Sequence, residues 1–341
     1  MNNLLKLKDK FIKPKEKFSV GLDIGTNSIK YVKLRLAKDK YDLLGFGQEA
    51  AGLDLINTLK KLKSECGFDA VNIATSGHQS IIRYVNFPRM DKDELGKALK
   101  FEAQKHIPFP IPEINLDGYI LKENLPDNKM LVLLAAVKKD FINLRLRQIE
   151  EVGLRINIID VDSISLINAF NINYPDEEAK QKTVALLNIG NTMTNLSILE
   201  DRLPRFSRDI YIAGNNFTQK IMDIFSLDFK VAEELKLNPD SERLSKVSAA
   251  VESVLINLAG EIRTSFDYYE SQSASFVAKI YLSGGSSKFS GMKEMLSNLL
   301  GIEVEYWDPL RQIGIVEGLD AQRLNDISAS LAVSVGLALR Q

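Results

Sequence analysis

The sequence predicts an α/β fold made of two related halves, with a small subdomain inserted into the first half. Two strand–turn–strand segments with the same pattern begin at Phe18 and Val184. In each, an apolar strand reaches Asp or Asn and then Gly, a short polar turn follows, and a second strand resumes. Near the end of the chain, an apolar strand runs into a third glycine turn, Gly284-Gly285, and then a helix. A repeated hairpin of this kind indicates a duplicated unit.

Composition restricts the class of protein. A chain of 341 residues is expected to hold about two domains. Its formal net charge of -1 gives no field that would attract nucleic acid. Cys66 is the single cysteine, so a disulfide framework is excluded, and with only two histidines a structural zinc site is not expected. The longest apolar run, residues 131–137, is too short to span a membrane, and no signal-peptide pattern opens the chain. We therefore expect a cytoplasmic protein.

An insert is expected to interrupt the first half. Residues 1–17 are rich in lysine and are interpreted as a solvated basic tail. The first unit then covers residues 18–79 and 155–182, and the insert covers residues 80–154. Apolar periodicity and capping signals, such as Asp91 with Glu94 three residues later, define the elements. Those expected after the hairpin are a helix at 53–68, strands at 70–74 and 80–87, a helix ending before residue 108, strands at 119–122 and 130–137, a helix at 140–152, and a strand at 155–161 followed by a helix.

The second half follows a charged linker at residues 175–182. It is predicted to comprise residues 183–213 and 276–326, interrupted by a helical subdomain at 214–275. In the long helix of this subdomain, apolar residues recur every three or four positions from Val247 to Tyr269 and should form a buried stripe. A final helix is expected within residues 327–341.

The glycine turns indicate phosphate binding. Glycine lets a backbone turn tightly, and consecutive N–H groups in such a turn form a nest for anions. Two facing turns could therefore hold the phosphates of a nucleotide from both sides. Asp23, just before the first turn, could hold Mg²⁺ through water. Lys30 is either a phosphate contact or a solvated strand residue, and the sequence does not separate these alternatives.

Several stretches carry a resemblance to a known family. They lie at residues 21–30, 87–90 with 94–95, 101–109, 159–162, 214–218, 232–236, 281–285 and 336–340. The pattern resembles the actin-like ATPase superfamily, which has a duplicated, ribonuclease-H-like fold. Within it the chain is similar to the PilM family of the type IV pilus machine, and more distantly to FtsA. The stretch 101–109 on the insert is specific to the PilM type.

The resemblance implies roles for the matching positions, with ATP and Mg²⁺ as cofactors. It places Glu233 and Lys236 at the ribose and base, whereas the pair alone would be interpreted as a surface ion pair. Gly214 would pass close to the nucleotide. The remaining implied contacts are a first phosphate turn of Gly25, Thr26, Asn27 and Ser28, a second of Gly190, Asn191, Thr192 and Thr194 beside Asn188, and an adenine and ribose contact at Gly284, Gly285 and Ser286.

Asn188 departs from the superfamily, which commonly has Asp at this position. An amide cannot share the charge of Mg²⁺ or accept a proton from an attacking water as a carboxylate can. No residue can be assigned as a catalytic base. We therefore expect tight ATP binding with slow or absent hydrolysis, at most a slow ATPase.

The resemblance also implies a partner. In the family, the N-terminal cytoplasmic tail of the membrane protein PilN lies in a groove between the first unit and the insert. Residues 80–87, 101–109 and 130–137 are the alternatives for lining it. Association with the inner membrane would then be indirect, and motor ATPases, the platform protein and self-association are further contacts the resemblance allows. The competing functions are an FtsA-like filament that tethers membrane and, less favoured, a small-molecule kinase.

Overall fold

A computed structural model describes residues 17–37, 40–52, 54–175 and 183–340. The predicted basic tail and charged linker therefore lie outside the described residues, except for Lys17 and Pro175. No helix among the described residues is long and apolar enough to cross a bilayer.

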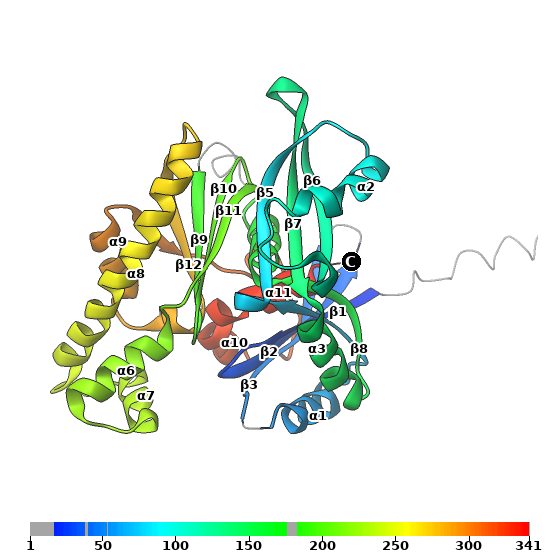
Figure 1. Ribbon diagram of the computed structural model, residues 1–341. Helices are drawn as coiled ribbons and strands as arrows, with labels where there is room; N and C mark the ends of the chain where they lie inside the picture. The colour runs from blue at the N-terminus through cyan, green and yellow to red at the C-terminus, as the bar shows by residue number, and fades with distance from the viewer. Residues whose placement is uncertain (1–16, 38–39, 53, 176–182, 341) are drawn as a thin grey trace, which may run out of the picture.

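The first unit is built on a mixed sheet. Among the described residues its strand order is β14-β3-β2-β1-β4-β8. Helices α1 (Leu55–Cys66) and α3 (Lys139–Glu151) lie next to each other against this sheet (Figure 1) and share one core with it. Helices α4 (Asp162–Asn173) and α11 (Ala332–Ala338) form a second core with the same sheet. The strands are β1 (Lys17–Ile24), β2 (Ser28–Ala37), β3 (Lys40–Ala50), β4 (Ala70–Thr75), β8 (Arg155–Val161) and β14 (Gly314–Ile315).

Strand β3 is absent from the sequence prediction. Gly45 and Gly47 interrupt its apolar alternation, which hides a strand from pattern reasoning. In the structure, a Cβ on Gly47 would lie 2.4 Å from the ring of Tyr31, so glycine is needed for the ring to pack here.

The second unit repeats this topology. Its described strands have the order β11-β10-β9-β12-β13. In both units three antiparallel strands follow one another along the chain, and a later strand, β4 or β12, pairs parallel with the first. The sheets thus confirm the predicted duplication. The strands are β9 (Thr183–Ile189), β10 (Thr194–Glu200), β11 (Leu203–Ile210), β12 (Val277–Ser283) and β13 (Glu303–Tyr306).

Four helices belong to the second unit. Figure 1 shows α8 (Leu244–Gln272) and α9 (Met292–Leu300) along its sheet, with α6 (Gly214–Phe225) and α7 (Phe229–Leu237) at one end. The stripe predicted in α8 is confirmed, because Val247, Val251, Leu258 and Ile262 are all fully buried in the core of this unit.

The insert has its own sheet, with described order β5-β7-β6. Its strands are β5 (Ser80–Pro88), β6 (Ile114–Leu125) and β7 (Lys129–Lys138). Helix α2 (Lys92–Ala103) begins with the predicted capping box of Asp91 and Glu94 and packs on these strands. Helix α3 differs from the prediction in its packing: Ile149 and Val152 are buried in the core of the first unit. The independent core of the insert therefore ends with β7.

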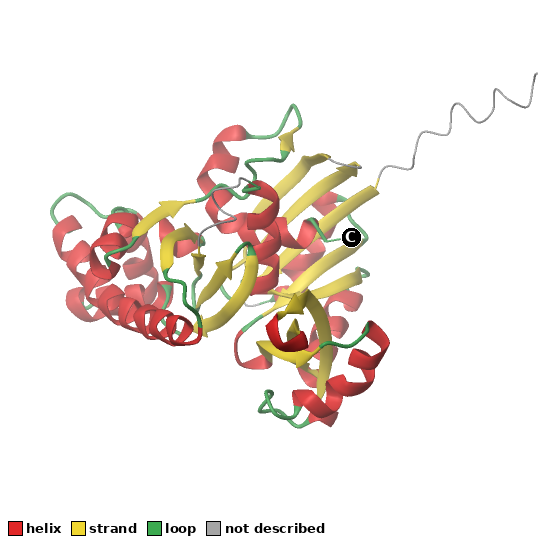
Figure 2. Ribbon diagram, turned by 90° about the horizontal axis from the view of Figure 1, so that it is seen from above, coloured by secondary structure: helices red, strands yellow, loops and turns green. Residues whose placement is uncertain are grey.

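The last part of the chain joins the two units. The 3₁₀ turns η4 (Gly285–Lys288) and η5 (Ser328–Leu331) meet, and α10 (Ala321–Ile327) precedes η5, so the single helix expected at the end is broken. Strand β14 pairs with β3 of the first sheet, although the sequence assigns residues up to 326 to the second unit. Helix α11 lies between β1 and α4. The view from above in Figure 2 shows helices between the two large groups of strands. A Cβ on Gly336 would lie 1.8 Å from the carbonyl oxygen of Ser165, so glycine permits this close packing.

Candidate functional site

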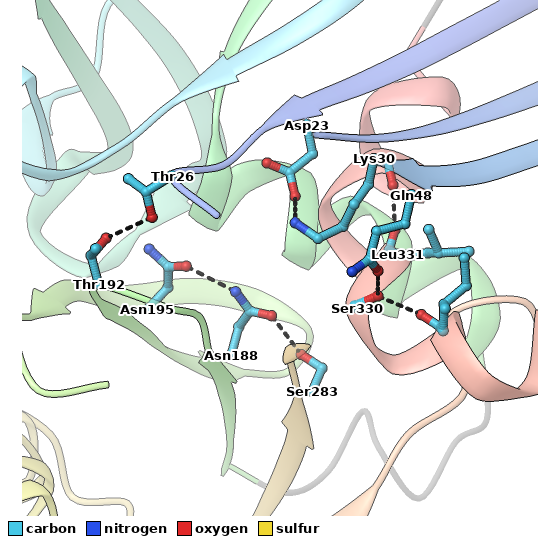
Figure 3. Close-up of polar contacts among 12 residues, drawn as sticks. Asp23, Thr26, Lys30, Gln48, Asn188, Thr192, Asn195, Ser283, Ser330 and Leu331 are labelled. Carbon is cyan, nitrogen blue, oxygen red and sulfur yellow. Dashed lines mark hydrogen bonds and ion pairs between the residues drawn. The ribbon is translucent and has the colours of Figure 1, made fainter. Parts of the chain in front are cut away.

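The two glycine turns have the same geometry and face each other. The N–H groups of Gly25 and Gly190 each donate to a carbonyl oxygen three residues further along, at 3.1 and 3.0 Å. A Cβ on either glycine would lie 2.9 Å from that oxygen. The hydroxyl oxygens of Thr26 and Thr192 are 3.4 Å apart across the two units (Figure 3). The structure therefore brings the two predicted turns together.

Asp23 and Lys30 form an ion pair at the base of the first turn. They lie opposite each other on β1 and β2, and Lys30 Nζ donates to Asp23 Oδ2 at 2.9 Å (Figure 3). The side chains of Lys30 and Asp23 are only 13% and 15% exposed, so Lys30 is not a solvated strand residue. Its charge partly neutralises the carboxylate beside the turn.

In the second hairpin, Asn188 is held at both ends of its amide. Its Nδ2 donates to Asn195 Oδ1 at 3.1 Å, and its Oδ1 accepts a hydrogen bond from Ser283 Oγ at 3.2 Å (Figure 3). Thr194 is fully buried, and its hydroxyl donates to the carbonyl oxygen of Ile212 at 2.7 Å. Both predicted site residues thus hold the hairpin together by internal hydrogen bonds.

The third glycine turn packs against the second. Gly284 has a φ of 99°, and a Cβ there would lie 2.3 Å from the carbonyl oxygen of Ile189. Ser286 Oγ donates to the carbonyl oxygen of Gly190 at 2.7 Å, and the N–H of Gly214 donates to the same oxygen at 3.1 Å. The start of α6 and the turn at Gly284 therefore converge on the second glycine turn.

Glu233 and Lys236 are not a surface ion pair. They lie 2.6 Å apart, and the Lys236 side chain is only 6% exposed. Lys236 Nζ also donates to Thr218 Oγ1 at 2.8 Å and to the carbonyl oxygen of Gly214 at 3.3 Å. Burial lowers the pKa of Lys236. Since all three N–H groups of the ammonium have partners within the protein, this lysine fixes the start of α6, and Glu233, at 23% exposure, is the member that can face a ligand.

Two carboxylates that sequence reasoning did not assign to the site lie beside it. Burial and then the charge of Asp23 raise the pKa of Asp162, the first residue of α4, to about 7. Asp209 on β11 also contributes to this effect, and its Oδ2 accepts a hydrogen bond from the N–H of Gly77 at 2.6 Å. Asp162 directly follows an apolar strand, and this position could have marked it as a candidate site residue in the sequence. No sequence pattern marks Asp209.

The polar groups around the second turn fit a nucleotide. Asn215 Oδ1 is buried without a hydrogen-bond partner, while the N–H of the same residue donates to the carbonyl oxygen of Asn191. A free acceptor at this place suits a donor such as a sugar hydroxyl. In the described part of the chain, no group of three or more His, Cys, Asp or Glu side chains could hold a metal ion. Mg²⁺ would therefore depend on phosphate oxygens and water as well as a carboxylate.

A groove of about 300 Å³ lies near these turns, where the insert meets both units. Ile81 and Arg83 of β5 and Phe109 line it from the insert, Val161 from the first unit, and Tyr211 from the second. A larger hollow of about 650 Å³ lies wholly in the insert, between the start of α2 and β6.

Comparison with known proteins identifies the family. A family model described as type IV pilus assembly protein PilM matches residues 21–341. The solved structure of a PilM-PilN type IV pilus biogenesis complex is 27% identical, covers 94% of this chain and 98% of its own, and superposes with a TM-score of 0.84. The ethanolamine utilization protein EutJ from Carboxydothermus hydrogenoformans is 14% identical over 95% of this chain and 89% of its own, with a TM-score of 0.58, and shows the fold alone.

Curated relatives match only a short segment. The chaperone protein DnaK of Cyanophora paradoxa is 26% identical over 115 residues, which are 31% of this chain, and the match spans 19% of the chaperone. The PilM match, which covers almost the whole chain, confirms both the resemblance and the predicted actin-like α/β fold with its insert. The protein belongs to the family of type IV pilus assembly proteins PilM.

Proposed function

We propose that this protein is an ATP-binding scaffold of type IV pilus assembly that docks the N-terminal cytoplasmic tail of a PilN-type membrane protein. The observation that carries the proposal is the meeting of the two glycine turns, one from each unit, at Thr26 and Thr192. A groove that both units line lies close by, since Gly77 and Asp209, which bond to each other, are among its lining residues. Nucleotide and peptide would thus occupy neighbouring sites between the same units.

Each candidate residue then has a stated role. Backbone N–H groups of residues 26–28 and 191–192 would bind phosphate oxygens, since those of Gly25 and Gly190 donate within the turns. Asp23 would hold Mg²⁺ through water. Gly214, Gly284, Gly285 and Glu233 would lie along the sugar and base. Lys236 would act indirectly, by fixing the first turn of α6. When bound, ATP with Mg²⁺ would supply the negative charge and the hydroxyl donors that this set of groups accommodates.

Slow or absent hydrolysis is part of the proposal. Asn188 cannot act as a base, and both ends of its amide have partners. Asp23 is paired with Lys30 and is assigned to Mg²⁺ rather than to proton transfer. This arrangement favours binding of ATP over its turnover.

The groove supports a choice among the candidate docking segments. Strand β7 is paired on both edges, so residues 130–137 cannot accept an added strand. Strand β5 and Phe109 remain, and both line the groove. The solved relative is a complex with PilN, which is consistent with a peptide partner here. Peripheral attachment to the inner membrane would follow from this contact, and contacts with motor ATPases, the platform protein or other copies stay predictions.

Titration of the full chain with the N-terminal peptide of its PilN-type partner tests the proposal. We expect saturable binding that Phe109→Ala weakens about tenfold or more, because truncating a groove aromatic removes about 1.4 kcal/mol or more. Phe101→Ala is the matched control, since Phe101 is 69% exposed on the same insert and does not line the groove. Absence of peptide binding to the wild-type protein, or equal weakening by both variants, would contradict the proposal.

A further inference from the structure

A continuous chain of side-chain hydrogen bonds crosses the second sheet. It starts at the N–H of Gly77, which donates to Asp209 Oδ2 at 2.6 Å. Asn195 Nδ2 donates to the other oxygen, Asp209 Oδ1, at 2.7 Å. The chain continues from Asn195 Oδ1 to Asn188 and ends at Ser283, as Figure 3 shows for the last two links. We call these five residues the polar chain.

The two ends of the polar chain lie at the two proposed binding sites. Gly77 begins the 3₁₀ turn η1 (Gly77–Gln79), just before β5, and lines the peptide groove. Ser283 ends β12 and is followed by Gly284-Gly285, which would lie against adenine and ribose. Between them, Asn188 and Asn195 face each other across the second phosphate hairpin. The two ends of the polar chain therefore adjoin the groups that the two ligands would touch.

The link between Gly77 and Asp209 is the one that crosses between the units. Gly77 has a φ of 72°, and a Cβ there would lie 3.3 Å from Met193 Cε, so this backbone also touches the second phosphate turn. Beside it, the rings of His78 and Tyr211 stack with centroids 4.1 Å apart. The wall of the groove is thus fastened to β11, which pairs with β10, the strand that follows the second turn.

The carboxylate of Asp209 joins the two units. Each of its oxygens accepts from a different donor, one in each unit. Asp209→Ala removes both acceptor oxygens and therefore both links. The N–H of Gly77 and the NH₂ of Asn195 lose these acceptors, so the substitution acts on this connection in particular.

We propose that Asp209 is a positioning residue that couples nucleotide occupancy of the second turn to peptide occupancy of the groove. This inference rests on the proposed function. A nucleotide that shifts the second hairpin relative to the first unit changes the position of β11, which forms one wall of the groove through Ser207, Asp209 and Tyr211. By linkage, the peptide changes nucleotide affinity by the same factor.

Four titrations of each protein test the coupling: peptide with and without a non-hydrolysable ATP analogue and Mg²⁺, and the analogue with and without peptide. For the wild-type chain we expect the two ratios of affinities to agree and to lie at about 5-fold or more, the usual range for allosteric coupling. In Asp209→Ala the ratio should fall towards 1. The readout is this ratio, so a general change in either affinity does not affect it.

Two further variants separate the polar chain from a loosened interface. Ser283→Ala removes the far link without touching the groove and should also lower the ratio. Tyr84→Phe removes a different bond, between the insert and the second unit, to Ser207 Oγ at 2.9 Å, and should keep the wild-type ratio. Equal effects of Tyr84→Phe and Asp209→Ala, or a wild-type ratio in both Asp209→Ala and Ser283→Ala, would overturn the inference. A wild-type protein that binds both ligands with a ratio of 1 overturns the inference alone, whereas failure to bind either ligand overturns the proposed function.

Discussion

Replacing Lys236 by Met tests whether this lysine is structural or a direct ligand contact. Its ammonium is 6% exposed and donates to Glu233, Thr218 and Gly214, so the substitution removes three hydrogen bonds and leaves a carboxylate without its counter-charge. Removing one member of a buried ion pair costs about 3–5 kcal/mol. Because Glu233 keeps 23% exposure to water, we expect the lower end, a loss of about 3 kcal/mol in the free energy of unfolding.

Urea unfolding of the protein without nucleotide measures this loss, as a lower midpoint at an unchanged m-value. Lys230→Met is the matched control, because Lys230 is exposed on the same helix and its substitution should change stability by at most about 0.5 kcal/mol. If Lys236→Met unfolds within about 0.5 kcal/mol of the wild-type protein and yet loses ATP binding, Lys236 is a direct nucleotide contact and the reasoning fails.

Three further substitutions test other parts of the site. Gly284→Ala should lower stability by about 2–4 kcal/mol in calorimetry, because φ is 99° and the new Cβ would meet the backbone of Ile189. Gly260→Ala is the control and should not lower stability, since a Cβ there lies in open space on α8. A loss smaller than about 1 kcal/mol for Gly284→Ala would contradict this reasoning. Burial and the charge of Asp23 raise the pKa of Asp162 to about 7, so its protonated form is favoured in the folded protein. The stability that this protonation contributes is fully present below about pH 4 and is lost as pH rises through about 7, which lowers the free energy of unfolding by up to about 4 kcal/mol. Asp162→Asn should therefore gain stability relative to wild type as thermal unfolding is followed from pH 4 to 8, and a constant difference would refute this. Asn188→Asp places a carboxylate against Asn195 Oδ1 and should cost about 1–3 kcal/mol, with phosphate release still below about one per second; faster turnover would show that the amide alone limits hydrolysis.

The features that the sequence predicts well are local. Each hairpin turn is defined by a glycine and a short polar segment within one strand–turn–strand, so Gly25 and Gly190 could be found from pattern alone. The stripe of α8 and the capping box of α2 are likewise contained in a few turns of one helix. Strand β3 is the local failure, because Gly45 and Gly47 remove the alternation that marks a strand.

The features that the sequence hides depend on contacts between distant segments. Gly77 and Asp209 are 132 positions apart, and no local pattern relates them. The burial of Lys236 arises where α7 packs on α6, so the spacing to Glu233 alone could not separate a surface pair from a buried one. Asn188 was identified as a departure from the superfamily, but its two hydrogen-bond partners lie on different strands and only the fold brings them together.

The central claim is that the two turns hold ATP without rapid hydrolysis. Mixing the purified full-length protein with Mg-ATP and following bound nucleotide and released phosphate in the same sample tests it most directly. We predict one ATP bound per chain, mostly intact, with turnover well below about one per second. Absence of nucleotide binding, or turnover above that rate, would contradict the claim.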